Sequence, residues 1–171
     1  LIGSALVASL REDGVEVTTL VRHEPTAPHE VQWLQDAAPL DPDAIAGADA
    51  VVCLNGASIG RFPWTPSYKS TLLWSRLTPT RTLATAVRAL GEDAPALINA
   101  SAVGYYGSQP GVELGEDATR GRGFLADVCV EWEDAARGAG DRARVALLRT
   151  AAVVHPQGVL KPLLLLTRLG V

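Results

Sequence analysis

The chain has 171 residues, of which 47% are apolar and 20% charged, with a formal net charge of −4. These values indicate one globular domain with a real core. They argue against a nucleic-acid partner, because phosphate binding needs a surplus of Lys and Arg, and against a membrane span, because no apolar run is long enough to cross a bilayer.

The hydrophobic pattern predicts helices and strands in alternation along the chain. The expected order is a helix over 3–12, a strand over 15–21, a short strand at 31–33, a short helix over 41–47, a strand over 49–55, a helix over 67–90, a strand over 96–101, a helix over 123–138 and a strand over 143–149. Pro79 is expected to kink the long helix or to start a fresh one. The apolar run at 49–55 is typical of a strand buried on both faces, central rather than at an edge.

Strands that alternate with helices indicate right-handed βαβ units. The predicted fold class is therefore α/β, a doubly wound parallel sheet of the Rossmann type with helices on both faces. In such a sheet, ligands bind at the carboxyl ends of the strands. The residues that follow the predicted strands are Arg22-His23, Asn55 to Ser58, Ser101 to Gly107, and Thr150 to Val153. Turns after strands also favour Gly, Asn and Ser, so this enrichment alone has a second explanation.

Cys53 and Cys129 both lie in apolar surroundings, and neither has a metal-ligand neighbour at short spacing. We expect buried free thiols in a reducing, cytoplasmic compartment and no metal site. The chain opens on Leu1 without a Met and stops on Val171 without a closing element. We therefore expect a piece of a longer protein.

Seven stretches together resemble the extended short-chain dehydrogenase/reductase superfamily. They are LIGSAL at 1–6, VTTLVR at 17–22, DAVVCLNGASI at 49–59, SRLTPTRTL at 75–83, ASAVGYYG at 100–107, GFLADVCVEWEDAA at 123–136 and LLRTAAVV at 147–154. More narrowly, they are similar to its atypical subgroup of NAD-dependent epimerase/dehydratase-like, sugar-nucleotide epimerase-like proteins. The resemblance runs from Leu1 to about Gly158. It implies that the first strand lies upstream of Leu1 and a substrate-binding segment beyond Val171.

The resemblance implies a dinucleotide cofactor. It also indicates which residues contact the pyrophosphate and the 2′-phosphate of that cofactor. Ile2 and Gly3 match the tail of the G-x-x-G-x-x-G loop, where the glycine lets the helix N-terminus approach the pyrophosphate. Arg22 stands where members of the superfamily select their cofactor. An Arg there pairs with the 2′-phosphate of NADP, so NADP is favoured over NAD. The alternative for Arg22 is a solvated surface side chain.

Five further positions are implied to contact the cofactor. Asn55, Gly56 and Ala57 match a loop of small residues that passes under the adenosine ribose. The alternative for this segment is a type I′ turn at Asn-Gly. Thr150 and Val153 match positions near the nicotinamide.

Ser101 matches the catalytic serine that hydrogen-bonds the reacting hydroxyl or carbonyl. Its alternative role is to satisfy a backbone group at the strand end. Tyr105 and Tyr106 would line the pocket on the loop that follows, with one facing the nicotinamide or substrate and the other packed inward.

The Tyr-x-x-x-Lys pair of the superfamily has no counterpart on the next helix. The positions that would carry it hold Leu125 and Cys129, neither of which is suited to this acid–base role. Glu131 and Glu133 are expected on the helix surface or in an ion pair with Arg149. Trp132 is expected in the core rather than beneath a cofactor.

The sequence thus predicts a dinucleotide-binding domain over 1–158 and the start of a substrate-binding segment over 159–171. The expected function is an NADP(H)-binding oxidoreductase or epimerase-like protein that acts on a small molecule. The alternative is a catalytically silent NADP-binding module with a structural or regulatory role. We also expect a homodimer through the helices at 67–90 and 123–138.

Overall fold

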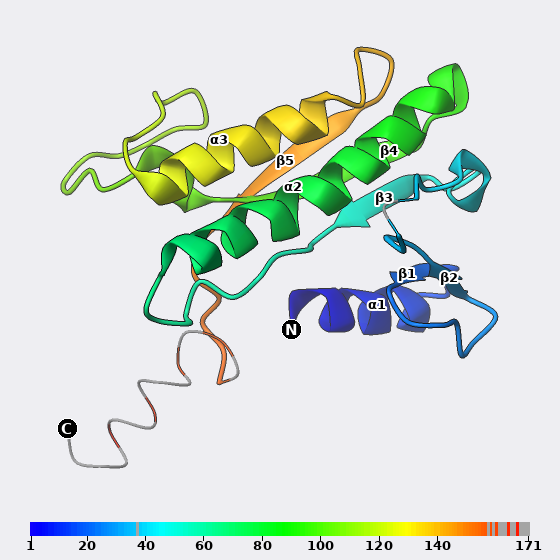
Figure 1. The fold of residues 1–171 in the computed structure, drawn as a ribbon, viewed down its shortest axis with the longest axis horizontal. Helices are drawn as coiled ribbons and strands as arrows, with labels where there is room; N and C mark the ends of the chain where they lie inside the picture. Colours follow the sequence, from blue (N-terminus) through cyan, green and yellow to red (C-terminus); the bar gives the residue numbers. More distant parts are fainter. Residues whose placement is uncertain (37, 157, 159, 161–163, 165–166, 168–171) are drawn as a thin grey trace. The chain divides into compact units, whose positions relative to one another are not determined.

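The computed structural model describes residues 1–36, 38–156, 158, 160, 164 and 167, and Figure 1 shows their fold. The chain divides into two compact units, residues 1–17 with 150–171 and residues 18–149, and each is described by itself. Most of the predicted elements lie in the second unit.

The first unit contains helix α1, Ile2–Glu12, which confirms the first predicted helix. Leu6 and Leu10, one turn apart, are half-buried, whereas Ala5 and Ser9 are exposed. The helix thus presents one narrow apolar stripe, as residues spaced by four along a helix do.

A two-stranded parallel sheet opens the second unit. It pairs β1, Thr19–Val21, with β2, Glu30–Gln32, with Thr19 opposite Glu30. The predicted strand over 15–21 is thus shortened to its last three residues, because its partner is only three residues long. The predicted helix over 41–47 is a single 3₁₀ turn, η1, Pro42–Ala44, in which the Asp41 carboxylate caps the backbone N–H of Asp43.

The main sheet of this unit has the order β3-β4-β5, with β3 at Ala50–Cys53, β4 at Ala96–Ala102 and β5 at Val145–Thr150. Strands β3 and β4 run parallel, with Ala50 opposite Ala96. Parallel strands joined through a helix give the α/β, Rossmann-type architecture that the sequence predicts. The described fold is a part of that architecture.

The prediction that β3 is central and buried on both faces is wrong for the described sheet. Val51 and Cys53 are buried, but Ala50 and Val52 are exposed. Among the described residues β3 pairs with β4 along one edge only. Its apolar side chains therefore alternate between core and surface.

Helix α2, Pro66–Ala89, connects the first two strands of this sheet. The Thr65 hydroxyl accepts a hydrogen bond from the Tyr68 N–H, and Pro66 occupies the first helical position, where its missing N–H costs nothing. The helix continues through the buried Pro79, so the prediction of a fresh helix there is wrong. A 3₁₀ turn, η2, Gly91–Asp93, follows.

Helix α3, Phe124–Arg137, packs beside α2, and both helices lie on the same face of the sheet (Figure 1). The core beneath them includes Leu83 and Val87 of α2 and Leu97 of β4. Each such buried side chain contributes about 1.5–3 kcal/mol of stability. Leu148, at 43% exposure, shows that the opposite face of β5 is uncovered within this unit.

In the part of the chain that the structure describes, no helix combines the length and apolar character that crossing a bilayer requires. Both cysteines are buried free thiols, as expected.

Candidate functional site

The predicted catalytic serine lies inside the molecule at the carboxyl end of β4. Ser101 is 2% exposed, and its hydroxyl donates a hydrogen bond of 2.7 Å to the Oε1 atom of Glu133 on α3. The alternation of β4 places Leu97, Asn99 and Ser101 on the face that the helices cover. The strand therefore places the Ser101 hydroxyl beside the Glu133 carboxylate.

Glu133 is completely buried and forms a two-pronged ion pair with Arg149 of β5. The Arg149 Nε atom lies 2.8 Å from Oε1, and Nη2 lies 2.9 Å from Oε2. Arg137, one turn further along α3, donates to Oε2 at 3.1 Å. The predicted ion pair with Arg149 is confirmed, whereas a place for Glu133 on the helix surface is wrong.

Opposing effects set the pKa of this carboxyl group. Burial acts to raise the pKa of Glu133, but the hydrogen bonds from Arg149 and Ser101 and the charges of Arg149 and Arg137 hold it below its ordinary value. The hydrogen bond to Glu133 raises the pKa of Arg149 above its ordinary value. The pair is therefore charged throughout the physiological range.

Both tyrosines of the loop after β4 are organised around the same arginine. They lie in a 3₁₀ turn, η3, Val103–Tyr106, in which the Tyr106 hydroxyl accepts a 2.8 Å hydrogen bond from Arg149 Nη1. The Arg149 guanidinium lies 3.6 Å from the Tyr105 ring centroid, a cation–π contact. Tyr106 is buried and Tyr105 half-buried, so one tyrosine packs inward as predicted.

A glycine fixes the position of η3. Gly121 donates its N–H to the Tyr105 carbonyl at 2.9 Å, and a Cβ atom on Gly121 would lie 2.2 Å from the Tyr106 carbonyl oxygen. Only a residue without a side chain permits this approach. The long segment before α3 is thus held directly against the tyrosines.

The two helix positions where the sequence analysis places the missing pair border this loop. Leu125 Cβ and Cys129 Sγ each lie 3.8 Å from where a Cβ atom on Gly104 would stand. Burial raises the pKa of the Cys129 thiol. This corner of the site therefore contains a hydrocarbon side chain and a neutral thiol, neither of which removes protons near neutral pH.

The loop after β3 leads into α2 and holds three of the predicted cofactor contacts. The Ala57 N–H donates to Ser75 Oγ at 2.9 Å, and the Ala57 carbonyl accepts from Arg76 Nη2 at 3.1 Å. Because β3 pairs in parallel with β4, Asn55 and Gly56 do not form a hairpin turn. Neither residue has the positive φ that both central positions of a type I′ turn require, so the type I′ alternative is wrong.

Arg22 follows β1 directly, and its side chain is exposed. Its carbonyl accepts a hydrogen bond from Gln35, while its guanidinium makes no ion pair with any carboxylate of the described residues. This side chain is therefore available to an anionic ligand.

The remaining predicted contacts belong to the other compact unit. Ile2 is exposed and Gly3 half-buried near the start of α1, and Thr150 and Val153 are exposed at and after the end of β5. Their place beside the residues of the second unit stays a prediction.

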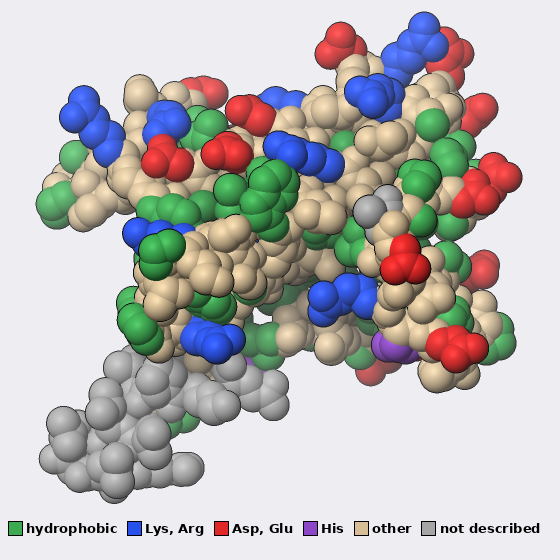
Figure 2. Space-filling model, viewed as in Figure 1, with side chains coloured by type: hydrophobic (Ala, Val, Ile, Leu, Met, Phe, Trp, Pro, Cys, Tyr) green, Lys and Arg blue, Asp and Glu red, His purple; other side chains and the backbone are tan. Residues whose placement is uncertain are grey.

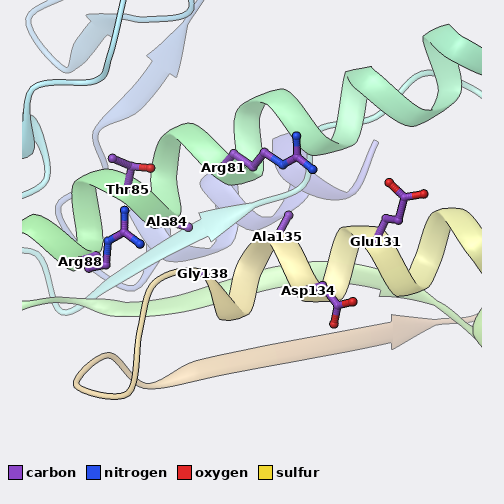
Figure 3. A pocket seen from close by; sticks show the side chains of 8 residues that line it. All are labelled: Arg81, Ala84, Thr85, Arg88, Glu131, Asp134, Ala135 and Gly138. Atoms are coloured by element: carbon purple, nitrogen blue, oxygen red, sulfur yellow. The ribbon is translucent and has the colours of Figure 1, made fainter.

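A groove lies between α2 and α3 (Figure 3). It encloses about 540 Å³, and arginines from α2 face acids from α3 across small side chains; the lining is Arg81, Ala84, Thr85, Arg88, Glu131, Asp134, Ala135 and Gly138. Figure 2 shows cations, acids and apolar side chains interspersed on the face that these helices form. The groove includes none of the predicted site residues, and the predicted homodimer through these helices stays a prediction.

The structure also reveals residues that the sequence analysis did not single out. Thr80 of α2 accepts a hydrogen bond from Trp132 Nε1 at 2.9 Å and donates to Asn99 Oδ1 at 3.1 Å. Trp132 is buried, as predicted. Arg76 lies against the loop after β3, a contact that no spacing in the sequence signals.

Comparison with known proteins assigns a family. The family described as "NAD dependent epimerase/dehydratase family" matches residues 1–124. "Epimerase family protein Mb2239" of Mycobacterium bovis is 44% identical over 159 residues, which cover 92% of this chain and 52% of the relative. A chloroplastic epimerase family protein of Arabidopsis thaliana is 30% identical over 173 residues, covering 92% of this chain and 47% of the relative. The chain spans about half the length of these relatives.

Two solved structures are similar over nearly the whole chain. The human epimerase family protein SDR39U1, crystallised with NADPH, matches with a TM-score of 0.81 at 29% identity, covering 99% of this chain and 57% of that one. A nucleoside-diphosphate sugar epimerase from Corynebacterium glutamicum matches with a TM-score of 0.79 at 37% identity, covering 98% of this chain and 35% of that one.

Proposed function

Because the chain belongs to the NAD-dependent epimerase/dehydratase family, we propose that it binds NADP(H) and forms part of an oxidoreductase or epimerase-like protein acting on a small molecule. Residues 1–158 would form the dinucleotide-binding region, and the chain from 159 onward would begin the substrate-binding segment. The bound nicotinamide would supply hydride transfer.

The observation that carries the preference for NADP is the position of Arg22. Its exposed guanidinium follows β1, and residues 18–23 contain no carboxylate that would accept the ribose hydroxyls of NAD. A guanidinium is a planar fork that pairs with a phosphate through two N–H groups. The human relative binds NADPH, which supports the same choice.

We further propose that Ser101 orients the reacting group of the substrate. Because its proton points at the Glu133 carboxylate, its oxygen acts toward any further partner as a hydrogen-bond acceptor. An acceptor favours a substrate hydroxyl over a substrate carbonyl. Tyr105 and Tyr106 would line the pocket, with the Arg149–Glu133 pair holding them in place.

The proposed chemistry proceeds without the Tyr-x-x-x-Lys pair, since Leu125 and Cys129 occupy those positions. The same observation favours a second candidate, a catalytically silent NADP-binding module. Incubating the intact protein with isotopically labelled NADPH and a metabolite mixture separates the two. Transfer of label to a metabolite supports the oxidoreductase, and complete absence of transfer supports the silent module.

Binding of NADPH and NADH to the intact protein tests the cofactor proposal. We expect tighter binding of NADPH, and we expect Arg22→Gln to weaken NADPH roughly tenfold to a hundredfold while NADH is unchanged, because a charge-assisted hydrogen bond is worth about 1.5–3 kcal/mol. Arg142→Gln, an exposed arginine before β5, is the matched control. Equal wild-type affinity for the two nucleotides would overturn the preference.

A further inference from the structure

Arg76 of α2 is a half-buried cation. Leu72, one helical turn before it, and Leu77, the next residue, are both buried. Its Nη1 donates to the Leu72 carbonyl at 2.8 Å, and its Nη2 donates to the Ala57 carbonyl at 3.1 Å. A guanidinium carries five N–H donors. Among the described residues, no carboxylate forms an ion pair with it.

The surrounding segment explains why Arg76 has no acidic partner along the chain. Residues 50–91 contain five cations, Arg61, Lys69, Arg76, Arg81 and Arg88, but no Asp or Glu. Four of these cations lie over aromatic rings of α2 and α3, namely Arg61 over Tyr68, Lys69 over Phe124, Arg76 over Trp132 and Arg81 over Trp74. In a chain of net charge −4, this acid-free stretch is a local positive region.

The guanidinium of Arg76 lies directly beneath the loop after β3. A Cβ atom on Gly56 would stand 3.1 Å from its Cζ atom, so the loop backbone rests against it because residue 56 is a glycine. On its other side, Cζ lies 5.2 Å from the ring centroid of Trp132, which follows Cys129 by three positions on α3. Arg76 therefore connects the predicted cofactor loop with the helix position where a lysine is expected.

The energetics of this position favour an anion. Burial lowers the pKa of Arg76 from its ordinary value, while Cys129 and Tyr68 act in the opposite direction. A partly desolvated cation without a counter-charge is costly, and an anionic ligand offsets that cost.

We propose that Arg76 is a ligand-binding residue of this site, which donates N–H groups to a phosphate oxygen of the bound ligand. It would supply from α2 the positive charge that Cys129 does not supply from α3. This inference rests on the proposed function. The phosphate could belong to the pyrophosphate of the dinucleotide or to a phosphorylated substrate bound beside it.

Three variants of the intact protein test this role: Arg76→Met, Arg76→Lys, and Arg81→Met as a matched control from the outer face of the same helix. If the dinucleotide supplies the phosphate, R76M weakens NADPH and NADH by the same factor of roughly ten or more, whereas Arg22→Gln affects NADPH alone. R76K, which keeps the charge but loses the fork, is expected to fall between R76M and the wild type. R81M is expected to bind both nucleotides as the wild type does.

If a substrate supplies the phosphate, R76M binds both nucleotides normally, but inorganic pyrophosphate binds the NADPH-saturated variant at least tenfold more weakly than the NADPH-saturated wild type. Circular dichroism shows whether each variant is folded. If R76M does not fold, the same binding measurements are made on R76K instead. Wild-type behaviour of the folded variant toward NADPH, NADH and pyrophosphate alike would overturn the role of Arg76. Failure of the wild type to bind either nucleotide would instead remove the proposed function.

Discussion

Two polar clusters lie two residues apart on the same face of β4, and they differ in charge. Asn99 joins Thr80 and Trp132 in a neutral cluster, closed by a 2.8 Å hydrogen bond from Asn99 Nδ2 to the Ala100 carbonyl. Ser101 joins Glu133 and Arg149 in a charged cluster that continues to the tyrosines of η3.

This difference indicates that the Asn99 cluster stabilises the fold, whereas the Ser101 cluster lies where a ligand would bind. The Asn99 cluster is formed by residues of β4, α2 and α3, so it fixes both helices to the sheet. The Ser101 cluster lies at the carboxyl end of the strand, where parallel sheets bind ligands, and it includes the half-buried Tyr105. Among the described residues, no buried side-chain nitrogen or oxygen in either cluster lacks a hydrogen-bond partner.

The largest expected effect comes from removing the charge at the centre of the second cluster. Glu133→Gln leaves Arg149 and Arg137 beside a neutral amide, which should lower the free energy of unfolding by about 3–5 kcal/mol, because breaking a buried pair leaves an uncompensated charge. Urea denaturation followed by circular dichroism measures this change.

Asp134→Asn is the matched control for Glu133→Gln. Asp134 is the next residue of α3 and also pairs with Arg137, but its side chain is 65% exposed. We expect a change of less than about 1 kcal/mol, as for surface ion pairs. Equal losses in the two variants would show that burial does not distinguish these carboxylates.

A smaller effect is expected in the neutral cluster. Thr80→Val keeps the shape of the side chain but removes the acceptor for Trp132 and the donor to Asn99. The loss should be about 1–3 kcal/mol, the cost of leaving buried polar groups unpaired. Thr85→Val, at an exposed position on the same helix, should change the free energy of unfolding by less than about 0.5 kcal/mol. A larger loss in the free energy of unfolding for Thr80→Val than for Glu133→Gln would show that the neutral cluster, and not the charged one, contributes more to stability.

The parts that the sequence predicts are those set by local pattern. The spacing of apolar residues predicts α3 to within a residue at each end. The ion pair of Arg149 with Glu133 is predicted from a strand residue and a residue of the helix that precedes that strand. The spacing of residues along α3 also indicates that Glu133 is buried. It follows Leu125 and Cys129 at intervals of four, which places a charge on the face that meets η3.

Other features depend on strand order and on the paths of loops, which local sequence patterns do not determine. The edge position of β3 follows from strand order, and a pattern of apolar residues does not distinguish one order from another. The contact of Arg76 with Ala57 depends on the path of the loop between β3 and α2. The hydrogen bond from Trp132 to Thr80 joins residues 52 positions apart, so the core position of the tryptophan is predictable but its partner is not.

The smallest effect, the dependence of stability on pH, sharpens the comparison because, of the two clusters, only the charged one contains a carboxyl group. The pKa of Glu133 in the folded protein lies below the ordinary value of 4.5. The unfolded state therefore binds the proton more tightly, and the contribution of Glu133 to stability is complete above about pH 4.5 and is lost as pH falls through the folded-state value. Urea denaturation at a series of pH values should show the difference between wild type and Glu133→Gln shrinking below pH 4.5. Thr80→Val, which keeps the buried carboxylate, should retain the wild-type slope. A constant difference between wild type and Glu133→Gln across this range would mean that the Glu133 carboxyl group has the same pKa in both states, and that Arg149 and Ser101 do no more than offset its burial.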